Sequence, residues 1–305
     1  MITSGPAGTN SMTGVASAWT DSIPMMVLSG QFRVPTLDLK KKLRGTAPQQ
    51  YFPVEMVKSI TKYSKLITRG EDIPREIRKA YIKSVSERPG PVWLDLPLDV
   101  QGAYIKADIN KDIKIIKNII KRNFKKRKNN KNILKTVKLL KFSKRPILIL
   151  GNGIKLSKSE ELAKKLVKKL KVPVLTTYST IDLIEDKNTM YFGRPGLYGQ
   201  RQANLIVQNC DLIISIGSGL HYELTGYNYK KFAKNAKKII VDIDKNELKK
   251  KNIQPNIPIK SDCKIYLKDF IKACDNELKY FKRVEWFDYC KKIRKKYKKN
   301  ILDKN

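Results

Sequence analysis

The feature that most constrains this fold is a repeated order of a short apolar run, a glycine turn and a helical pattern. Residues 145–153 run Arg-Pro-Ile-Leu-Ile-Leu-Gly-Asn-Gly, and residues 211–218 run Asp-Leu-Ile-Ile-Ser-Ile-Gly-Ser. Further strand-sized runs follow at 172–177 and 238–244. Continuous apolar strands are typical of parallel sheets that are covered on both faces. Because right-handed crossovers place helices on both faces, this part of the chain is predicted to form a doubly wound sheet.

The first part of the chain repeats this order. Residues 24–30 predict a buried strand that ends in glycine, residues 72–85 a helix, and residues 92–97 a second strand. The predicted fold class is therefore α/β, with two doubly wound parallel-sheet units. We predict a first domain over residues 1–105, a lysine-rich linker over 106–136, a second domain over 137–280 and a helical tail over 281–305.

Two helical details are predicted within the second domain and the tail. Ser157 and Glu160 have the spacing of a capping box that opens a helix. In the tail, residues 286–297 place large apolar side chains three or four positions apart, which predicts an amphipathic helix.

The charge balance is strongly basic, with 64 Lys and Arg against 28 Asp and Glu, a net charge of +36. One interpretation is a polyanion partner whose phosphates the lysines neutralise. The favoured interpretation is compositional, because lysine far outnumbers arginine and lies on the polar faces of helices throughout. The like-charge run at 121–131 is interpreted as a solvated connection, with a nucleic-acid arm as the less favoured alternative.

Several classes of site are disfavoured by the residues present. The four cysteines, Cys210, Cys263, Cys274 and Cys290, form no C-x-x-C pair, and His221 is the single histidine. A zinc site or a serine-type triad is therefore not expected. No apolar run approaches the roughly 18 residues of a membrane helix, and no basic leader precedes an apolar stretch. A cytoplasmic protein without a membrane span is expected.

Glycine turns and carboxylates follow several of the predicted strands. Because open α/β sheets bind ligands outside the carboxyl ends of their strands, these turns together suggest a nucleotide-shaped cleft. Each also has a plainer interpretation: a lone G-x-G is often a simple turn, and the Asp pair could cap a helix that begins near Asn246. The turns are Gly151-Asn-Gly153, Gly193-Arg-Pro-Gly196, Gly217-Ser-Gly219 and Asp242-Ile-Asp244.

Residues 3–31 carry Ser-Gly-Pro-Ala-Gly-Thr-Asn, a small-residue helix, Asp-Ser-Ile-Pro and Ser-Gly-Gln in that order. Residues 88–100 run Arg-Pro-Gly-Pro-Val-Trp-Leu-Asp-Leu-Pro-Leu-Asp-Val. This combination resembles the pyrimidine-binding domain of acetolactate synthase-like thiamine-diphosphate enzymes. Residues 193–204 and 211–218 resemble the central domain of the same family. The resemblance covers nearly the whole chain outside the lysine-rich linker.

The resemblance implies roles for particular residues. It places Pro6 and Asn10 at the aminopyrimidine of thiamine diphosphate and Gln49 near the reacting carbon. It leaves open FAD in the central domain, because Gly219 stands where the family places an arginine and His221-Tyr-Glu-Leu replaces charged family residues. The FAD positions implied by the resemblance are Arg88, Gly196, Asn204, Gly217, Ser218, Asp242 and Asp244.

The family also needs parts that these 305 residues do not supply. Its cofactor-activating glutamate precedes the S-G-P motif, and its G-D-G motif, which binds Mg²⁺ with the diphosphate, does not occur here. We expect a fragment that is inactive alone, and we assign none of its residues as a metal ligand. The intact enzyme is expected to act on a 2-oxo acid such as pyruvate, as a homo-oligomer or with a partner chain that supplies the missing domains. The alternative from another class is a non-catalytic remnant that binds nucleotides or polyanions.

Overall fold

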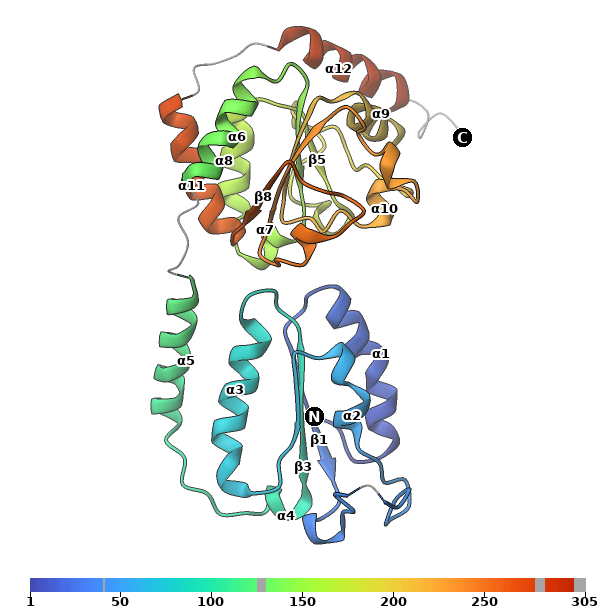
Figure 1. Cartoon of the computed structure of the whole chain (residues 1–305), viewed down its shortest axis with the longest axis vertical. Coiled ribbons are helices and arrows are strands. Elements are labelled where there is room, and N and C mark those ends of the chain that lie inside the picture. Colours follow the sequence, from blue (N-terminus) through green and yellow to red (C-terminus); the bar gives the residue numbers. More distant parts are fainter. Residues whose placement is uncertain (41, 125–129, 278–282, 299–305) are drawn as a thin grey trace. The chain divides into compact units, whose positions relative to one another are not determined.

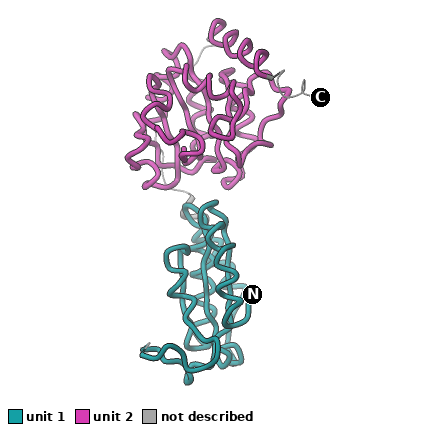
Figure 2. The backbone as a smooth tube through the Cα atoms, turned by 90° about the vertical axis from the view of Figure 1, so that its right-hand side faces the viewer, with its two compact units in different colours: residues 1–126 teal, residues 127–305 magenta. Residues whose placement is uncertain are grey.

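A computed structural model describes residues 1–40, 42–124, 130–277 and 283–298. The chain divides into two compact units, residues 1–126 and residues 127–305, which Figure 2 colours separately. Each unit has its own parallel sheet and its own core. Within the described residues, no helix is both long enough and apolar enough to cross a membrane.

The first unit is a three-stranded parallel sheet in the order β1-β3-β2. Helices α1 and α2 lie on one face, α3 lies on the other, and α5 lies along the outer side of α3 (Figure 1). The strands are β1 (Met25–Gln31), β2 (Tyr63–Leu66) and β3 (Pro91–Pro97). The α-helices are α1 (Pro6–Thr20), α2 (Pro53–Met56), α3 (Ile73–Val85), α4 (Leu98–Gln101) and α5 (Ile109–Phe124), and the 3-10 helices are Val34–Thr36, Lys58–Ile60 and Gly70–Asp72.

Strand β3 is the centre of this unit and is buried on both faces. Trp93 packs on the α1 and α2 side, whereas Val92 and Leu94 pack on the α3 side. All three side chains are completely buried. This alternation is the period of two that a strand imposes, and it explains why the strand has an almost continuous apolar sequence.

The region predicted as a lysine-rich linker contains two helices. In the first unit, α5 lies beside α3, where Arg78 forms an ion pair with Asp112. In the second unit, α6 (Asn130–Phe142) buries Ile133, Val137 and Leu140 in the core. The lysines between these apolar positions leave the helical spacing intact, so the charge of this region does not prevent it from packing. Residues 125–129 of the like-charge run lie outside the described residues.

The second unit is a five-stranded parallel sheet in the order β5-β4-β6-β7-β8. The strands are β4 (Pro146–Leu150), β5 (Val174–Thr176), β6 (Leu212–Ile216), β7 (Lys237–Asp242) and β8 (Ile257–Lys260). The remaining α-helices are α7 (Gly153–Leu156), α8 (Glu160–Leu170), α9 (Arg201–Asn209), α10 (Tyr222–Thr225), α11 (Cys263–Glu277) and α12 (Val284–Lys298), and the 3-10 helices are Tyr178–Thr180, Tyr229–Lys231 and Glu247–Lys249.

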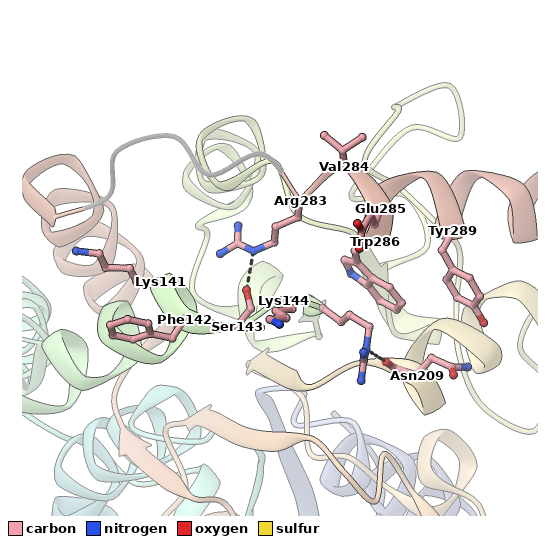
Figure 3. Close-up of a pocket in the computed structure, with 11 residues that line it drawn as sticks. Lys141, Phe142, Ser143, Lys144, Asn209, Arg283, Val284, Glu285, Trp286 and Tyr289 are labelled. Carbon is pink, nitrogen blue, oxygen red and sulfur yellow. Dashed lines mark hydrogen bonds between the residues drawn. The ribbon is translucent and has the colours of Figure 1, made fainter.

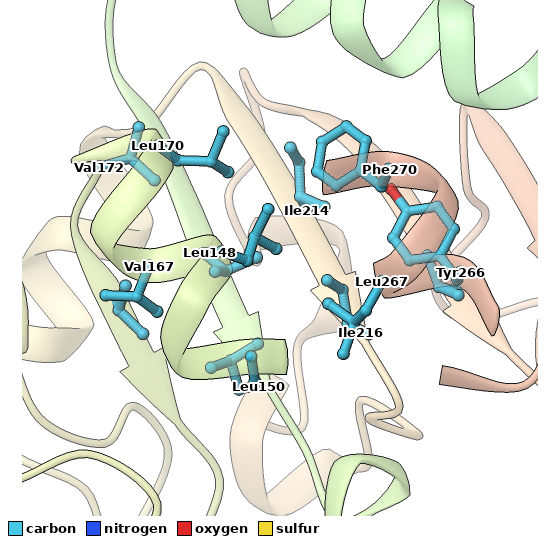
Figure 4. Packing of buried hydrophobic residues seen from close by; sticks show 14 of the residues in the cluster. Leu148, Leu150, Val167, Leu170, Val172, Ile214, Ile216, Tyr266, Leu267 and Phe270 are labelled. Atoms are coloured by element: carbon cyan, nitrogen blue, oxygen red, sulfur yellow. The ribbon is translucent and has the colours of Figure 1, made fainter. Parts of the chain in front are cut away.

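Each central strand of this sheet packs into two hydrophobic cores, one on each face of the sheet. In β4, Leu148 and Leu150 point into the core beneath α6, α8 and α11 (Figure 4), whereas Ile147 and Ile149 belong to the core beneath α9 and α12. Burying each such side chain is worth roughly 1.5–3 kcal/mol. The apolar runs seen in the sequence are therefore two-sided strands, and the predicted α/β class with two parallel-sheet units is confirmed.

The predicted capping box is wrong. Helix α8 begins at Glu160 with Ser159 as its N-cap, and no side-chain hydrogen bond caps it. The Ser157 hydroxyl instead donates to the carbonyl oxygen of Ile154, at the end of the preceding short helix α7. The spacing alone could not show that a separate helical turn ends at Ser157.

Candidate functional site

The first candidate site is the amino-terminal turn of α1. Gly5 has a φ of 71°, a conformation that glycine adopts without the clash that a Cβ would cause. Pro6 then occupies the first turn, where its missing N–H costs no helical hydrogen bond. Pro6 and Asn10 are both exposed, and they lie on one helix face because they are four residues apart. Two predicted cofactor residues therefore share one accessible surface.

Gln49 lies against this turn. A Cβ built on Gly5 would come within 3.1 Å of the Gln49 carbonyl oxygen and 3.3 Å of the Gln49 Cβ. Gln49 is exposed and has a φ of 60°, which is uncommon for a residue with a side chain. The structure thus brings Gln49 next to the residue that precedes Pro6, although the two segments are far apart in the sequence.

The residues that hold this arrangement were not found from the sequence. The Tyr51 hydroxyl donates to the Gly5 carbonyl oxygen at 2.5 Å, and the Tyr51 carbonyl oxygen accepts a 2.9 Å bond from Gln31 Nε2. Gln31 Nε2 also donates to Asp95 at 3.0 Å. The sequence did contain a signal for this network, namely a glutamine and an aspartate inside apolar strands, because buried polar groups need partners.

Arg88 lies at the other end of the first sheet. It precedes β3 and donates from Nε to the Ser22 hydroxyl at 2.8 Å, just before β1 begins. The Gly5 turn lies at the opposite, carboxyl end of β1, since the Gly30 N–H donates to the carbonyl oxygen of Ile2. Arg88 is therefore not part of the surface formed by Pro6, Asn10 and Gln49.

In the second unit, two predicted turns meet at the topological switch point of the sheet, between β4 and β6. The Gly153 N–H donates to the Gly217 carbonyl oxygen at 2.9 Å. A Cβ on Gly151 would lie 2.6 Å from the Cα of Ser218. Glycine is required here because the two backbones touch. The switch point is where sheets of this strand order bind ligands, but the N–H of Gly153 is already used by the protein.

Gly196 and Asn204 form a closed pair of hydrogen bonds. The Gly196 N–H donates to Asn204 Oδ1 at 2.7 Å, and Asn204 Nδ2 donates to the Gly196 carbonyl oxygen at 3.0 Å. Gly196 has a φ of 124°, and a Cβ there would lie 2.3 Å from the carbonyl oxygen of Glu223 on α10. Asn204 thus fixes the loop before α9.

The carboxylates of the Asp242 and Asp244 pair also bond to backbone. Asp242 accepts from the Asp244 N–H, and Asp244 accepts from the Asn246 N–H, each at 2.8 Å. Asn246 is the N-cap of the 3-10 helix Glu247–Lys249. This agrees with the plainer interpretation of the pair as a turn that leads into a helix. The predicted flavin residues of this unit therefore hold its loops in place.

The cysteines and the histidine form no reactive centre. All four cysteines are buried, and burial raises the pKa of Cys210 and of Cys274 to about 12. Thiols with raised pKa values are poor nucleophiles at neutral pH. His221 is exposed and precedes α10. Among the described residues, no group of three or more His, Cys, Asp and Glu side chains is placed to hold a metal ion.

A separate hollow of about 770 Å³ lies on the second unit (Figure 3). It contains none of the predicted site residues. Arg283 Nε donates to the Ser143 carbonyl oxygen at 2.9 Å, and Trp286 Nε1 donates to the Pro146 carbonyl oxygen at 3.1 Å. These bonds attach the start of α12 to the end of α6 and the start of β4. The hollow therefore lies where α12 packs against α6 and β4.

Two protein-family models match the chain, and together they cover more than half of it. The model "Thiamine pyrophosphate enzyme, N-terminal TPP binding domain" matches residues 1–56. The model "Thiamine pyrophosphate enzyme, central domain" matches residues 133–270. The first match contains Pro6, Asn10 and Gln49, and the second contains the glycine turns of the switch point.

The curated relatives agree with these matches. A probable acetolactate synthase large subunit from Methanococcus aeolicus is 38% identical over 273 residues, which is 90% of this chain and 44% of the relative. The large subunit from Lactococcus lactis is 32% identical over 98% of this chain and 49% of its own length. Acetolactate synthase 2 from Nicotiana tabacum is 33% identical over 88% of this chain and 38% of its own length.

The chain thus spans half or less of the length of these relatives. The resemblance stated from the motifs is confirmed by both kinds of comparison. With a TPP-binding segment followed by a central domain, in the order in which they lie here, this chain belongs to the thiamine pyrophosphate (thiamine diphosphate) enzyme family.

Proposed function

We propose that this chain is part of a thiamine-diphosphate-dependent enzyme of the acetolactate synthase type. The reaction decarboxylates a 2-oxo acid such as pyruvate and transfers the two-carbon unit to a second carbonyl group. The observation that carries the proposal is the position of Gln49 against the Gly5–Pro6 turn. It places an exposed carboxamide next to the surface that carries Pro6 and Asn10, as a cofactor site assembled from two segments requires.

The residues present fit the neutral, heteroaromatic part of thiamine diphosphate. The α1 turn offers an apolar ring at Pro6 and uncharged hydrogen-bonding groups at Asn10 and Gln49, all exposed. In this proposal Pro6 and Asn10 bind the aminopyrimidine, and the Gln49 amide hydrogen-bonds the cofactor beside its reacting carbon, where it also orients the substrate. When bound, the cofactor supplies stabilisation of the carbanion equivalent, and Mg²⁺ holds its diphosphate. We assign no residue of this chain to the metal.

FAD is a second cofactor to test, in the central domain. Its residues in this proposal are those implied by the family resemblance. In their present arrangement Gly196 and Asn204 bond to each other, so flavin binding there would require these polar atoms to exchange partners. Flavin absorbance of the purified chain, released by denaturation, is the direct measurement. An equimolar flavin supports the assignment, and none at saturating FAD contradicts it.

We also propose that the catalytic assembly contains more than one chain. The family resemblance implies a cofactor site between chains, so a homo-oligomer or a partner polypeptide completes it. Light scattering on the eluting protein, with and without thiamine diphosphate and Mg²⁺, measures this directly. A cofactor-dependent increase in mass is the expected result.

The function is tested by binding thiamine diphosphate with Mg²⁺ to the 305-residue chain, measured by calorimetry. Asn10→Ala and Gln49→Ala should each weaken binding about tenfold, the effect of losing roughly one good hydrogen bond from a binding site. Thr20→Ala is the matched control, because Thr20 is exposed at the other end of α1. Equal affinity for all four proteins would contradict the assignment.

Because the chain is expected to be inactive alone, cofactor binding rather than pyruvate turnover decides this test. The competing function, a non-catalytic polyanion binder, gives a different result. It predicts salt-dependent retention of nucleic acid with a steep slope and no effect of thiamine diphosphate.

A further inference from the structure

Asp95 is the most deeply buried acidic side chain of the first unit's sheet. It lies on β3 directly opposite Ser29 of β1, and its side chain is completely buried. The Ser29 hydroxyl donates to Asp95 Oδ1 at 2.6 Å, and Gln31 Nε2 donates to Oδ2 at 3.0 Å. Both donors are uncharged and almost fully buried. A carboxyl group in such a place is costly, so its bonds to these partners matter.

Gln31 connects Asp95 to a segment outside the sheet. Its Nε2 donates both to Asp95 and to the carbonyl oxygen of Tyr51, while its Oε1 accepts from the Phe32 N–H at 3.0 Å. The carboxamide is therefore held at both ends in one orientation. Because Asp95 accepts one of the two Nε2 hydrogens, the other hydrogen points at Tyr51.

Tyr51 connects Gln31 to the α1 turn. Its carbonyl oxygen is held by Gln31, and its hydroxyl donates to the Gly5 carbonyl oxygen. A Cβ on Gly8 would lie 2.3 Å from the Tyr51 hydroxyl oxygen, so the phenol occupies space that only glycine leaves open. Gln49 comes two residues before Tyr51 and lies against Gly5.

We propose that Asp95 is a positioning residue which, through Gln31 and Tyr51, holds Gln49 against the Gly5–Pro6 turn. Asp95 touches none of the residues assigned to the cofactor. Its role in catalysis rests on the proposed function, but its role in placing the 45–51 segment does not. Ser29 binds the other carboxylate oxygen and has no contact with this segment among the described hydrogen bonds, which makes it a matched control.

The test is amide hydrogen exchange on the 305-residue chain. The reporters are the N–H groups of Thr46 and Gln50, which bond within the segment to Gln50 Oε1 and the Ala47 carbonyl oxygen. Gln31→Met removes the donor with little change of volume, and Asp95→Leu removes the acceptor while keeping the branching of the side chain. Both should speed exchange of these amides by about fivefold to tenfold, the effect of one lost buried hydrogen bond, while the amides of β1 and β3 stay protected.

Two further variants separate positioning from general support of the sheet. Ser29→Ala should leave Thr46 and Gln50 exchange unchanged. Asp95→Asn should stay within about twofold of the parent chain, because its carboxamide oxygen can still accept from Gln31 while its Nδ2 donates to Ser29. If Asp95→Leu does not fold, the smaller Asp95→Ala removes the same acceptor and takes its place.

The proposal is overturned if folded Asp95→Leu or Gln31→Met leaves the exchange of Thr46 and Gln50 unchanged, or if Ser29→Ala accelerates it equally. Thiamine diphosphate affinity is measured on the same proteins. If the parent chain does not bind the cofactor but the exchange pattern is as expected, the proposed function fails and the positioning role stands. If the parent chain binds and Gln31→Met binds equally well, the link from Asp95 to the cofactor site is contradicted.

Discussion

The carbonyl oxygen of Gln49 lies where a side chain on Gly5 would project, with only 3.1 Å between it and a Cβ built there. The close approach of these two residues joins the 45–51 segment to the amino-terminal turn of α1. Because a side chain at position 5 would meet Gln49, the surface with Pro6 and Asn10 requires glycine there.

Gly5→Ala should therefore destabilise the first unit. The backbone at Gly5, with φ 71° and ψ −140°, is a conformation that costs other residues about 1–3 kcal/mol. Urea unfolding of the chain measures the loss. Gly14→Ala is the control on the same helix, because nothing lies within 4 Å of a Cβ there and alanine favours helix by about 0.5–1 kcal/mol. A Gly5→Ala chain as stable as Gly14→Ala would contradict the geometry.

The stability contributed by Asp95 should depend on pH. Burial raises the pKa of this carboxyl to about 6, although the bonds from Ser29 and Gln31 act to lower it. In the unfolded chain an aspartate titrates near about 3.9, so between these values the folded state holds a proton that the unfolded state has lost. The free energy of unfolding therefore falls by roughly 3 kcal/mol as pH rises through this window.

Asp95→Asn isolates this effect, because asparagine does not titrate. The variant should gain stability relative to the parent chain between about pH 4 and about pH 7, when both are unfolded in urea. Comparing the two chains cancels the titration of all other groups. A difference between them that does not change with pH would contradict the raised pKa.

Asn204→Ala should destabilise the second unit by about 1–2 kcal/mol, because it removes both hydrogen bonds to Gly196. Asn209→Ala is the control on the same helix, where an exposed carboxamide donates one bond to the Leu205 carbonyl oxygen. Thermal unfolding distinguishes the two variants. Equal losses would show that the Gly196 loop does not depend on Asn204.

Leu148→Ala should be among the most damaging single changes in the second unit. Leu148 is completely buried between β5 and β6 in the core beneath α8 and α11. Truncating such a residue costs about 2–5 kcal/mol, through lost burial and the cavity left behind. Leu134→Ala on α6 is the control, because that side chain is 51% exposed and should change stability by less than about 0.5 kcal/mol.

Local sequence pattern was enough to predict the two-sided strands. Runs such as Pro146–Leu150 and Leu212–Ile216 place apolar side chains on both faces and are followed by glycine, so composition alone identifies them as strands. Strand β2 (Tyr63–Leu66) and strand β8 (Ile257–Lys260) were not predicted, because they are short and mix polar residues or proline with apolar ones. The other two edge strands, β1 and β5, were predicted because their sequences contain longer apolar runs.

The candidate site was predictable only in part. Pro6, Asn10 and Gln49 came from a family resemblance, and their assignment to a cofactor stays a prediction. Gln31, Tyr51 and Asp95 were missed because their connection depends on the register of β1 with β3, which no local pattern encodes. A buried polar side chain is informative only when its partners are known, and those partners are distant in sequence.

The hydrogen bond from Trp93 Nε1 to the Ser29 hydroxyl, at 2.8 Å, gives this network a built-in optical reporter. The indole and the Asp95 carboxylate both bond to the Ser29 hydroxyl, so the emission of Trp93 should respond to the charge of Asp95 without any attached label. Of the other tryptophans, Trp19 is exposed and Trp286 belongs to the second unit. With Trp19→Phe and Trp286→Phe in place, a single emitter would follow the interior of the first sheet in real time as ligands are added.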